Sequence, residues 1–197
     1  MNIILGSSSP RRKDLLKQIF DSFLIMHPKV DEIPHPFEKP LEFVKRASSD
    51  KLQDIQSRIF HNPALMITCD TIVTIDNEIL GKPADYDHAF QMLSKLSGKT
   101  HQVISAISLL YKNNHYCHKH YDYEITHVTF KPLNKSDIAN YLSLINYKDK
   151  AGAYAAQENG NMIIQNIDGS LTNVIGFPLR CFFRMAVDMD IIQKLFA

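Results

Sequence analysis

Residues 3–16 read Ile3-Ile4-Leu5-Gly6-Ser7-Ser8-Ser9-Pro10-Arg11-Arg12-Lys13-Asp14-Leu15-Leu16. The apolar start predicts a short strand, the small residues predict a tight turn, and the rest predicts a helix whose apolar stripe continues through Ile19 and Phe20. Ser9 is a suitable N-cap, and Pro10 suits the first helical position because its missing N–H costs nothing there. The chain therefore opens with a strand, a turn and a helix.

The first turn of this helix carries three cations. Arg11, Arg12 and Lys13 lie where the helix dipole already places partial positive charge, which disfavours each by roughly a few tenths of a kcal/mol. A bound polyanion would remove the conflict, because free backbone N–H groups, serine hydroxyls and guanidinium groups all bond phosphate oxygens. On this stretch alone, a basic turn exposed to water has equal weight.

Length and composition set the class of protein. The chain has 197 residues, of which 45% are hydrophobic and 22% charged, the balance of an ordinary globular protein. A net charge of +1 argues against a broad nucleic-acid surface. Three cysteines, odd in number and far apart, favour a reducing compartment over a disulfide scaffold. We expect a single domain over residues 1–197 in the cytoplasm, without a signal peptide or membrane span.

Apolar periodicity predicts alternating strands and helices. We expect helices over residues 41–59, 85–96, 136–145 (with Ser136 near the cap) and 179–196, and strands over residues 23–26, 64–75, 100–111, 115–133, 162–167 and 171–177. The strands over 100–111 and 115–133 flank Asn113-Asn114 and form a hairpin. This order predicts a mixed α/β fold.

Two charged residues stand in apolar surroundings. Asp70 lies between Ile67 and Ile72, so it is either buried with partners or faces a cleft at a strand end. Lys51 falls at the edge of the apolar stripe of the helix over 41–59. It is either a functional cation or a lysine whose stem lies along the core while its ammonium group stays in water. Lys82 lies between Gly81 and Pro83, which suits a fixed cation, although an exposed loop lysine is the commoner case.

A cluster of metal-binding residue types lies between residues 115 and 120. His115 and Cys117 face one side of the predicted strand, and His118 and His120 face the other. No closed tetrahedral set results, and no second pair at zinc spacing is evident elsewhere in the sequence. The pattern therefore disfavours a structural zinc site.

Seven separated motifs follow one another in the order of a known family. They are Ser7-Ser8-Ser9-Pro10-Arg11-Arg12; Asp31-Glu32; Arg46-Ala47 with Lys51; Asp70-Thr71-Ile72-Val73 paired with Gly81-Lys82-Pro83; Ser97-Gly98-Lys99-Thr100-His101-Gln102-Val103; Lys150-Ala151-Gly152-Ala153-Tyr154 with Gln157; and Gly176-Phe177-Pro178-Leu179. Together they resemble the Maf nucleoside triphosphate pyrophosphatases over nearly the whole chain.

The resemblance implies a fold and a reaction. The fold is an elongated α/β structure, related to the ITPase fold, with a mixed sheet flanked by helices and two lobes around a nucleotide cleft, often as a homodimer. The reaction is hydrolysis of a nucleoside triphosphate between its α and β phosphates with a divalent metal, Mg²⁺ or Mn²⁺, giving a monophosphate and pyrophosphate. Arg11, Thr71 and Gln157 match positions that the resemblance ties to the branch preferring dTTP and UTP.

The resemblance also implies residue roles, and the chemistry of the side chains agrees. The resemblance assigns Asp70 the role of general base, and the carboxylates of Glu32 and Asp70 could share the metal. Hydrolysis of a phosphoanhydride needs charge neutralisation, which suits the predicted triphosphate ligands Ser7, Ser9, Arg11, Arg12, Lys51 and Lys82. The amide of Gln157 offers an acceptor and a donor, which match N3–H and O4 of uracil or thymine.

Departures from the family pattern bear on the substrate more than on the chemistry. Glu158 stands where the family often has glycine and adds a charge beside Gln157, while Leu171 and Phe177 change packing. A nucleotide-binding regulator of cell division with little turnover is the main alternative function. A nucleic-acid-binding module is the weaker one, because the charge is near neutral and no interleaved basic and aromatic motifs occur.

Overall fold

The computed structural model describes residues 1–60 and 62–196. Its strands are β1 (Asn2–Gly6), β2 (Leu24–Met26), β3 (Ala64–Ile75), β4 (Glu78–Leu80), β5 (Thr100–Lys112), β6 (Cys117–Phe130) and β7 (Ile164–Asp168). Its helices are α1 (Pro10–Lys17), α2 (Pro40–Ser57), α3 (Tyr86–Leu96), α4 (Lys135–Leu144), α5 (Leu171–Ile175), α6 (Leu179–Asp188) and α7 (Ile192–Leu195), with short 3₁₀ turns η1 (Ala151–Ala153) and η2 (Gly160–Met162). The predicted mixed α/β class is confirmed.

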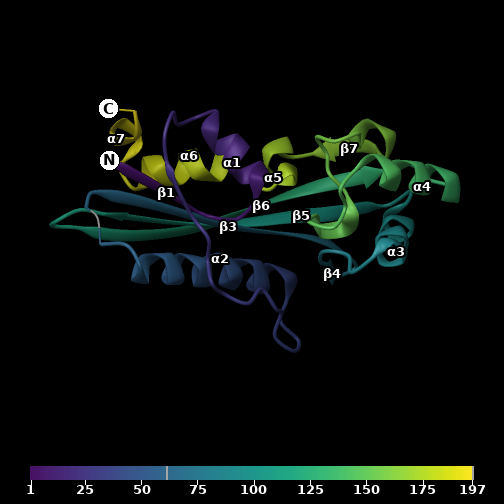
Figure 1. Ribbon diagram of the computed structural model, residues 1–197, viewed down its shortest axis with the longest axis horizontal. Coiled ribbons are helices and arrows are strands. Elements are labelled where there is room, and N and C mark those ends of the chain that lie inside the picture. Colours follow the sequence, from purple (N-terminus) through teal and green to yellow (C-terminus); the bar gives the residue numbers. More distant parts are fainter. Residues whose placement is uncertain (61, 197) are drawn as a thin grey trace. The chain divides into compact units, whose positions relative to one another are not determined.

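The described strands form one mixed sheet (Figure 1). Its order is β2-β1-β3-β5-β6-β7, and β4 pairs with β3 off this path. β1 runs parallel to β2 and to β3, with Leu5 opposite Ile67, whereas β4 and β7 are antiparallel to their partners. The parallel pairing of β1 with β3 places the carboxyl end of β1 beside the middle of β3, where Asp70 lies two residues beyond the partner of Gly6.

The chain divides into two compact units. The first comprises Met1–Asp70, Ser105–Glu124 and Gly176–Ala197, and the second comprises Thr71–Ile104 and Ile125–Ile175. β3, β5 and β6 contribute residues to both units. The single domain expected over residues 1–197 stays a prediction.

In the first unit, helices cover both faces of the sheet. Figure 1 shows α2 on one face and α1 and α6 on the other. Ile4, Leu52, Ile55 and Met66 are fully buried or nearly so in the core between α2 and the sheet. Removing this much apolar surface from water is the main stabilising contribution.

Buried hydroxyl groups also join α2 to the sheet. The Oγ atom of Ser48 lies 2.8 Å from the Oγ of Ser108 on β5, and Thr68 on β3 donates to the carbonyl of Ser48 at 2.8 Å. Because these buried polar groups are hydrogen-bonded to one another, the bonds offset the cost of desolvation and hold α2 against the sheet.

In the second unit, the core surrounds a buried histidine. The Nε2 of His101 lies 2.8 Å from the hydroxyl oxygen of Tyr154, and its ring meets Phe130 edge-on. Burial lowers the pKa of His101 to about 4. The imidazole is therefore neutral at physiological pH, as its apolar surroundings require.

The strand predicted over residues 171–177 is wrong. Residues Leu171–Ile175 form α5. Ser170 Oγ accepts the N–H of Asn173 at the start of this helix, and the Asn173 side chain donates to the carbonyl of Val103 (3.1 Å) and to Thr126 Oγ1 (2.9 Å). The short apolar run suggested a strand, but these long-range bonds to a buried asparagine select a helical turn.

The helix predicted over residues 179–196 is also wrong as a single element. It breaks between α6 and α7 at Asp190, whose φ of 52° is left-handed, and the N–H of Ile191 closes α6 on the carbonyl of Ala186. The break turns Ile191 and Leu195 into the core.

Two helix ends differ from the sequence predictions as well. α4 begins at Lys135 and is capped by Asn134 through a capping box with Asp137, and Ser136 lies two residues after this cap. α1 ends at Lys17, so Ile19 and Phe20 follow the helix instead of belonging to it. Element ends depend on hydrogen bonds that apolar periodicity does not report.

Among the described residues, no helix has both the length and the apolar character needed to cross a bilayer.

Candidate active site

The turn between β1 and α1 is built by serine side chains. Ser7 is buried, and its Oγ accepts the N–H of Ser9 at 3.1 Å. Ser9 has extended backbone angles and caps α1 by accepting the N–H of Arg12, as predicted. The turn thus holds two predicted phosphate ligands at the start of a helix, the end that favours anions.

Gly6 is required at the start of this turn. A Cβ at Gly6 would lie 2.6 Å from Cγ2 of Thr68 and 2.9 Å from Cγ1 of Ile55, closer than side-chain atoms approach. The absence of a side chain lets β1, β3 and α2 meet beside Ser7.

Arg12 is held inside the first unit. It is only 9% exposed, and its guanidinium donates to the carbonyl of Gly176 at 2.8 Å and to Ser7 Oγ at 3.3 Å. This buried arginine excludes the alternative of a wholly water-exposed basic turn. Arg11, by contrast, is partly exposed.

Lys51 joins three parts of the first unit. Its Nζ atom on α2 lies 2.6 Å from Oδ1 of Asp70 on β3 and 2.8 Å from Oε1 of Glu32 in the segment that precedes α2. The side chains of Lys51 and Asp70 are 4% and 7% exposed. The alternative in which the Lys51 ammonium lies in water is therefore wrong, and the sequence-predicted set of Lys51, Asp70 and Glu32 converges on one point.

Opposing influences act on the carboxyl group of Asp70. Burial raises the pKa of Asp70, and the negative charge of Glu32 raises it further. The positive charges of Lys51 and Arg12 lower it. Burial dominates, so the pKa lies above the ordinary value for an aspartate. A carboxylate whose pKa is raised in this way is a better proton acceptor than a carboxylate in water.

The remaining predicted residues belong to the second unit. Thr71 follows Asp70 on β3, while Lys82 lies just beyond β4 and is exposed. Gln157 is also exposed, and its Nε2 donates to Oε1 of Glu158 at 3.4 Å. The N–H of Gly152 donates to the carbonyl of Gly81 at 3.1 Å, which links the run of small residues before Gln157 to the loop of Lys82.

A family comparison decides the identity of this arrangement. The model of the Maf-like protein family matches residues 2–189, which includes every predicted site residue. The chain belongs to the Maf family. The Maf resemblance expected from the motifs is thereby confirmed.

Curated relatives cover nearly the full chain. A dTTP/UTP pyrophosphatase from Clostridioides difficile (strain 630) is 42% identical over 181 residues, covering 91% of this chain and 90% of the relative. One from Leptospira interrogans is 38% identical over 182 residues, covering 92% of each. A solved nucleoside-triphosphatase / dITP/XTP pyrophosphatase from Mycobacterium abscessus aligns with 82% of this chain and 93% of its own at a TM-score of 0.41 and 11% identity, too distant a likeness to bear on function.

Glu32 and Asp70 are the residues that would hold a hard divalent cation. Both carboxylates contact the Nζ of Lys51, and carboxylate oxygens are the ligands that Mg²⁺ or Mn²⁺ prefers. In residues 1–60 and 62–196, no three His, Cys, Asp or Glu side chains cluster as a metal site. Two carboxylates suit a cation whose other ligands are substrate phosphates and water.

Two further charged residues, Glu38 in the first unit and Lys150 in the second, make contacts that the sequence did not predict. Glu38 accepts two bonds from Arg46 beside the segment of Glu32, and Lys150 is buried with Nζ 2.6 Å from the carbonyl of Asn146 and 3.5 Å from Oε1 of Glu158. Lys150 opens the Maf motif Lys150-Ala151-Gly152-Ala153-Tyr154, so the sequence did contain a signal for this residue. Nothing in the sequence marks Glu38, because its partner Arg46 lies eight residues further on, inside α2.

Proposed function

We propose that this protein hydrolyses dTTP and UTP to the monophosphate and pyrophosphate. The observation that carries the proposal is the contact of the buried Lys51 ammonium with both Asp70 and Glu32, in the unit that also holds the Ser7–Arg12 turn. Relatives at 38–42% identity over nine-tenths of the chain, named dTTP/UTP pyrophosphatases, support the same reaction.

The residues at the turn and on α2 suit a triphosphate. Arg12 and Lys51 supply positive charge, Ser7 and Ser9 supply hydroxyl groups, and α1 presents its N-terminus. Arg11 adds a second guanidinium in the same turn. In the second unit, Lys82 keeps its proposed part as a phosphate ligand on the strength of the Gly81-Lys82-Pro83 motif.

Asp70 is the proposed general base. It takes a proton from a water molecule as the water oxygen attacks the α phosphorus, and the bond from that phosphorus to the bridging oxygen breaks with release of pyrophosphate. Lys51 holds the Asp70 carboxylate in place. A divalent cation held by Glu32 and Asp70 would neutralise charge on the phosphates.

Base selection falls to residues of the second unit in this proposal. Gln157 reads the pyrimidine through its amide, and Thr71 contributes beside Asp70, as the Maf resemblance implies. The bond from Gln157 to Glu158 supports a fixed amide orientation, because it uses one of the two N–H groups of Gln157.

The first experiment measures products from a panel of nucleoside triphosphates with Mg²⁺ or Mn²⁺, for the wild type and Asp70→Asn. We expect pyrophosphate with UMP or TMP from the wild type and a loss of both from the variant. Orthophosphate with a diphosphate would show attack at the γ phosphorus and overturn the proposal. Binding without turnover of any nucleotide would favour the regulatory alternative.

Assembly and location are part of the proposal. We propose a homodimer in the cytoplasm, as the Maf resemblance implies. Light scattering after size exclusion tests the dimer directly, and a mass near 22.6 kDa would contradict it.

A further inference from the structure

The segment between β2 and α2 runs back along α2 and is tied to it at three places. At one end, Asp54 accepts the N–H of Lys29 at 3.0 Å, and Arg58 donates to the carbonyl of His27 at 2.9 Å. In the middle, Glu32 contacts Lys51. At the other end, Arg46 bonds Ile33 and Glu38. We call this set of bonds the Arg46 clasp.

The Arg46 clasp consists of three short bonds. Nε of Arg46 donates to Oε1 of Glu38 at 2.7 Å, and one terminal nitrogen donates to Oε2 of Glu38 at 2.7 Å and to the carbonyl of Ile33 at 2.9 Å. Glu38 in turn accepts the N–H of His35 at 2.9 Å. A single guanidinium thus fixes a carboxylate and a backbone carbonyl together, which only its planar fork allows.

The clasp acts on the residue next to Glu32. Ile33 follows Glu32 directly, so holding the Ile33 carbonyl restrains the backbone from which the Glu32 side chain extends. The Glu32 side chain is 45% exposed, so burial alone does not hold it at Lys51. Without the clasp, ordering this segment and the flexible Glu32 side chain would cost conformational entropy each time the site assembles.

We propose that Arg46 is a positioning residue that sets Glu32 at Lys51 by clasping residues 33–38 to α2. The consequence for metal and turnover rests on the proposed function, in which Glu32 holds the cation. The effect of the clasp on the order of the segment between β2 and α2 does not depend on the proposed function.

The charges of the clasp persist across the working pH range. Hydrogen bonds from Arg46 lower the pKa of Glu38 to about 2. Asp50, 3.2 Å from a terminal nitrogen of Arg46, adds a further negative charge on α2. The clasp is therefore a constant support and not a pH switch.

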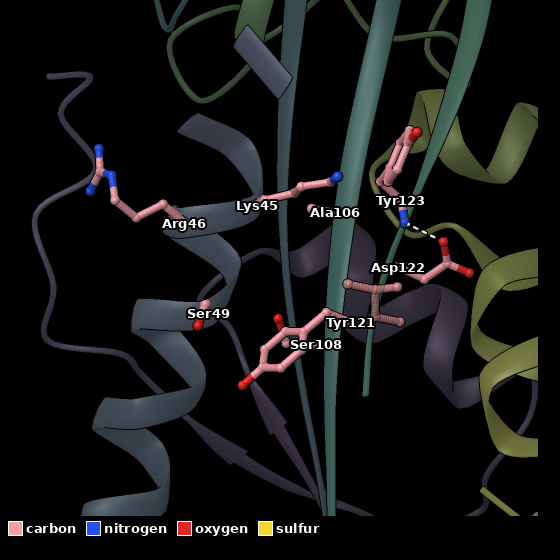
Figure 2. Close-up of a pocket in the computed structure, with 9 residues that line it drawn as sticks. Lys45, Arg46, Ser49, Ala106, Ser108, Tyr121, Asp122 and Tyr123 are labelled. Atoms are coloured by element: carbon pink, nitrogen blue, oxygen red, sulfur yellow. Dashed lines mark hydrogen bonds between the residues drawn. The ribbon is translucent and has the colours of Figure 1, made fainter. Parts of the chain in front are cut away.

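The adjacent residue on α2 provides a matched control. Figure 2 shows Lys45 and Arg46 leaving α2 in opposite directions, Arg46 toward the Glu32 segment and Lys45 across a cavity of about 400 Å³ toward Tyr123. The Nζ of Lys45 lies 4.2 Å from the centre of the Tyr123 ring. Lys45→Ala removes a neighbouring cation with its own partner and leaves the clasp intact.

The first test measures hydrogen exchange of peptides that span residues 29–39 in the metal-free protein. We expect Arg46→Ala and Glu38→Gln to raise exchange there at least tenfold while exchange in β1 and β3 stays unchanged. Arg46→Lys should restore part of the protection only, because an ammonium lacks the fork. Unchanged exchange in Arg46→Ala, or an equal increase in Lys45→Ala, would overturn the proposal.

The second test asks whether Arg46 acts through Glu32. We expect Arg46→Ala and Glu32→Gln each to raise the Mn²⁺ concentration that gives half-maximal UTP hydrolysis by about tenfold, the usual scale for residues that orient metal ligands. The double variant should be no worse than Glu32→Gln alone. Additive effects would show that Arg46 acts independently of Glu32 and overturn the proposal. A wild type that releases no pyrophosphate refutes the proposed function instead, and leaves the exchange test to decide the clasp.

Discussion

The Nζ atom of Lys51 lies 2.6 Å from Oδ1 of Asp70, and both side chains are buried. Taking two charges out of water is costly, and their mutual attraction with good hydrogen bonding offsets that cost. Removing only one partner of the pair is therefore expected to destabilise the first unit. Removing Lys51 would leave the buried Asp70 carboxylate with the positive charge of Arg12, whereas removing Asp70 would leave Lys51 paired with the half-exposed Glu32.

Lys51→Met should destabilise the protein by about 3–5 kcal/mol, because it removes the cation that contacts the buried Asp70 carboxylate at 2.6 Å. Urea unfolding of the wild type, Lys51→Met, Asp70→Asn and the double variant measures the effect. The double variant should regain much of the loss, because no uncompensated charge remains. If Lys51→Met unfolds at the wild-type urea concentration, the ion pair contributes nothing to stability.

His101 should make stability depend on pH between about 6.5 and 4. Its pKa falls from 6.5 in the unfolded chain to about 4 in the folded protein because it is buried, so the unfolded state binds more protons in this range. Stability is therefore full above pH 6.5 and declines as the pH falls toward 4, by up to about 3 kcal/mol at about 1.4 kcal/mol for each pH unit.

Unfolding at pH 7, 5.5 and 4.5 for the wild type and His101→Gln measures this contribution of His101. The variant lacks the titrating imidazole, so the difference between the two proteins should shrink as the pH falls. Within the described residues, Nδ1 of His101 has no hydrogen-bond partner, so a charged imidazolium would be unsatisfied there. A constant difference at all three pH values would contradict the prediction.

Gly6→Ala should destabilise the protein by about 1–3 kcal/mol. Its new Cβ would lie within 3 Å of atoms of Thr68 and Ile55, both fully buried, so β1 or α2 must shift. Gly81→Ala is the matched control for stability, since a Cβ at Gly81 meets no atom within 4 Å. Urea unfolding of both variants measures the contrast, and equal effects would mean that steric contact at Gly6 is unimportant.

Gln157→Glu should reduce the preference for UTP over GTP by about tenfold, or about 1.4 kcal/mol. A carboxylate cannot donate to O4 of the pyrimidine as the amide does. The ratio of kcat/KM for the two nucleotides measures the preference. Glu158→Gln is the control, because it keeps a hydrogen-bond acceptor for Gln157. An unchanged ratio in Gln157→Glu would show that this residue does not read the base.

Local residue chemistry sufficed for the strand, the turn and the helix at the start of the chain. Ser9 caps α1 and Pro10 begins it because both act within three or four residues. Apolar periodicity, which is also a local property, predicted the strand over residues 64–75 and the helix over residues 85–96. Asn173 shows where local reasoning fails, since its bonds to Val103 and Thr126 turn an apparent strand into α5.

The sequence by itself determined the α/β class, the Maf family and the candidate residues, because periodicity, turn residues and ordered motifs are local or linear properties. Only the tertiary structure decided that Lys51 is buried against Asp70 and Glu32, that Arg12 bonds the carbonyl of Gly176, and that Arg46 clasps Glu38. These contacts join residues 8 to 164 positions apart. They form because burying a charge requires a partner of opposite charge or a hydrogen-bond acceptor, and the fold alone brings that partner within reach.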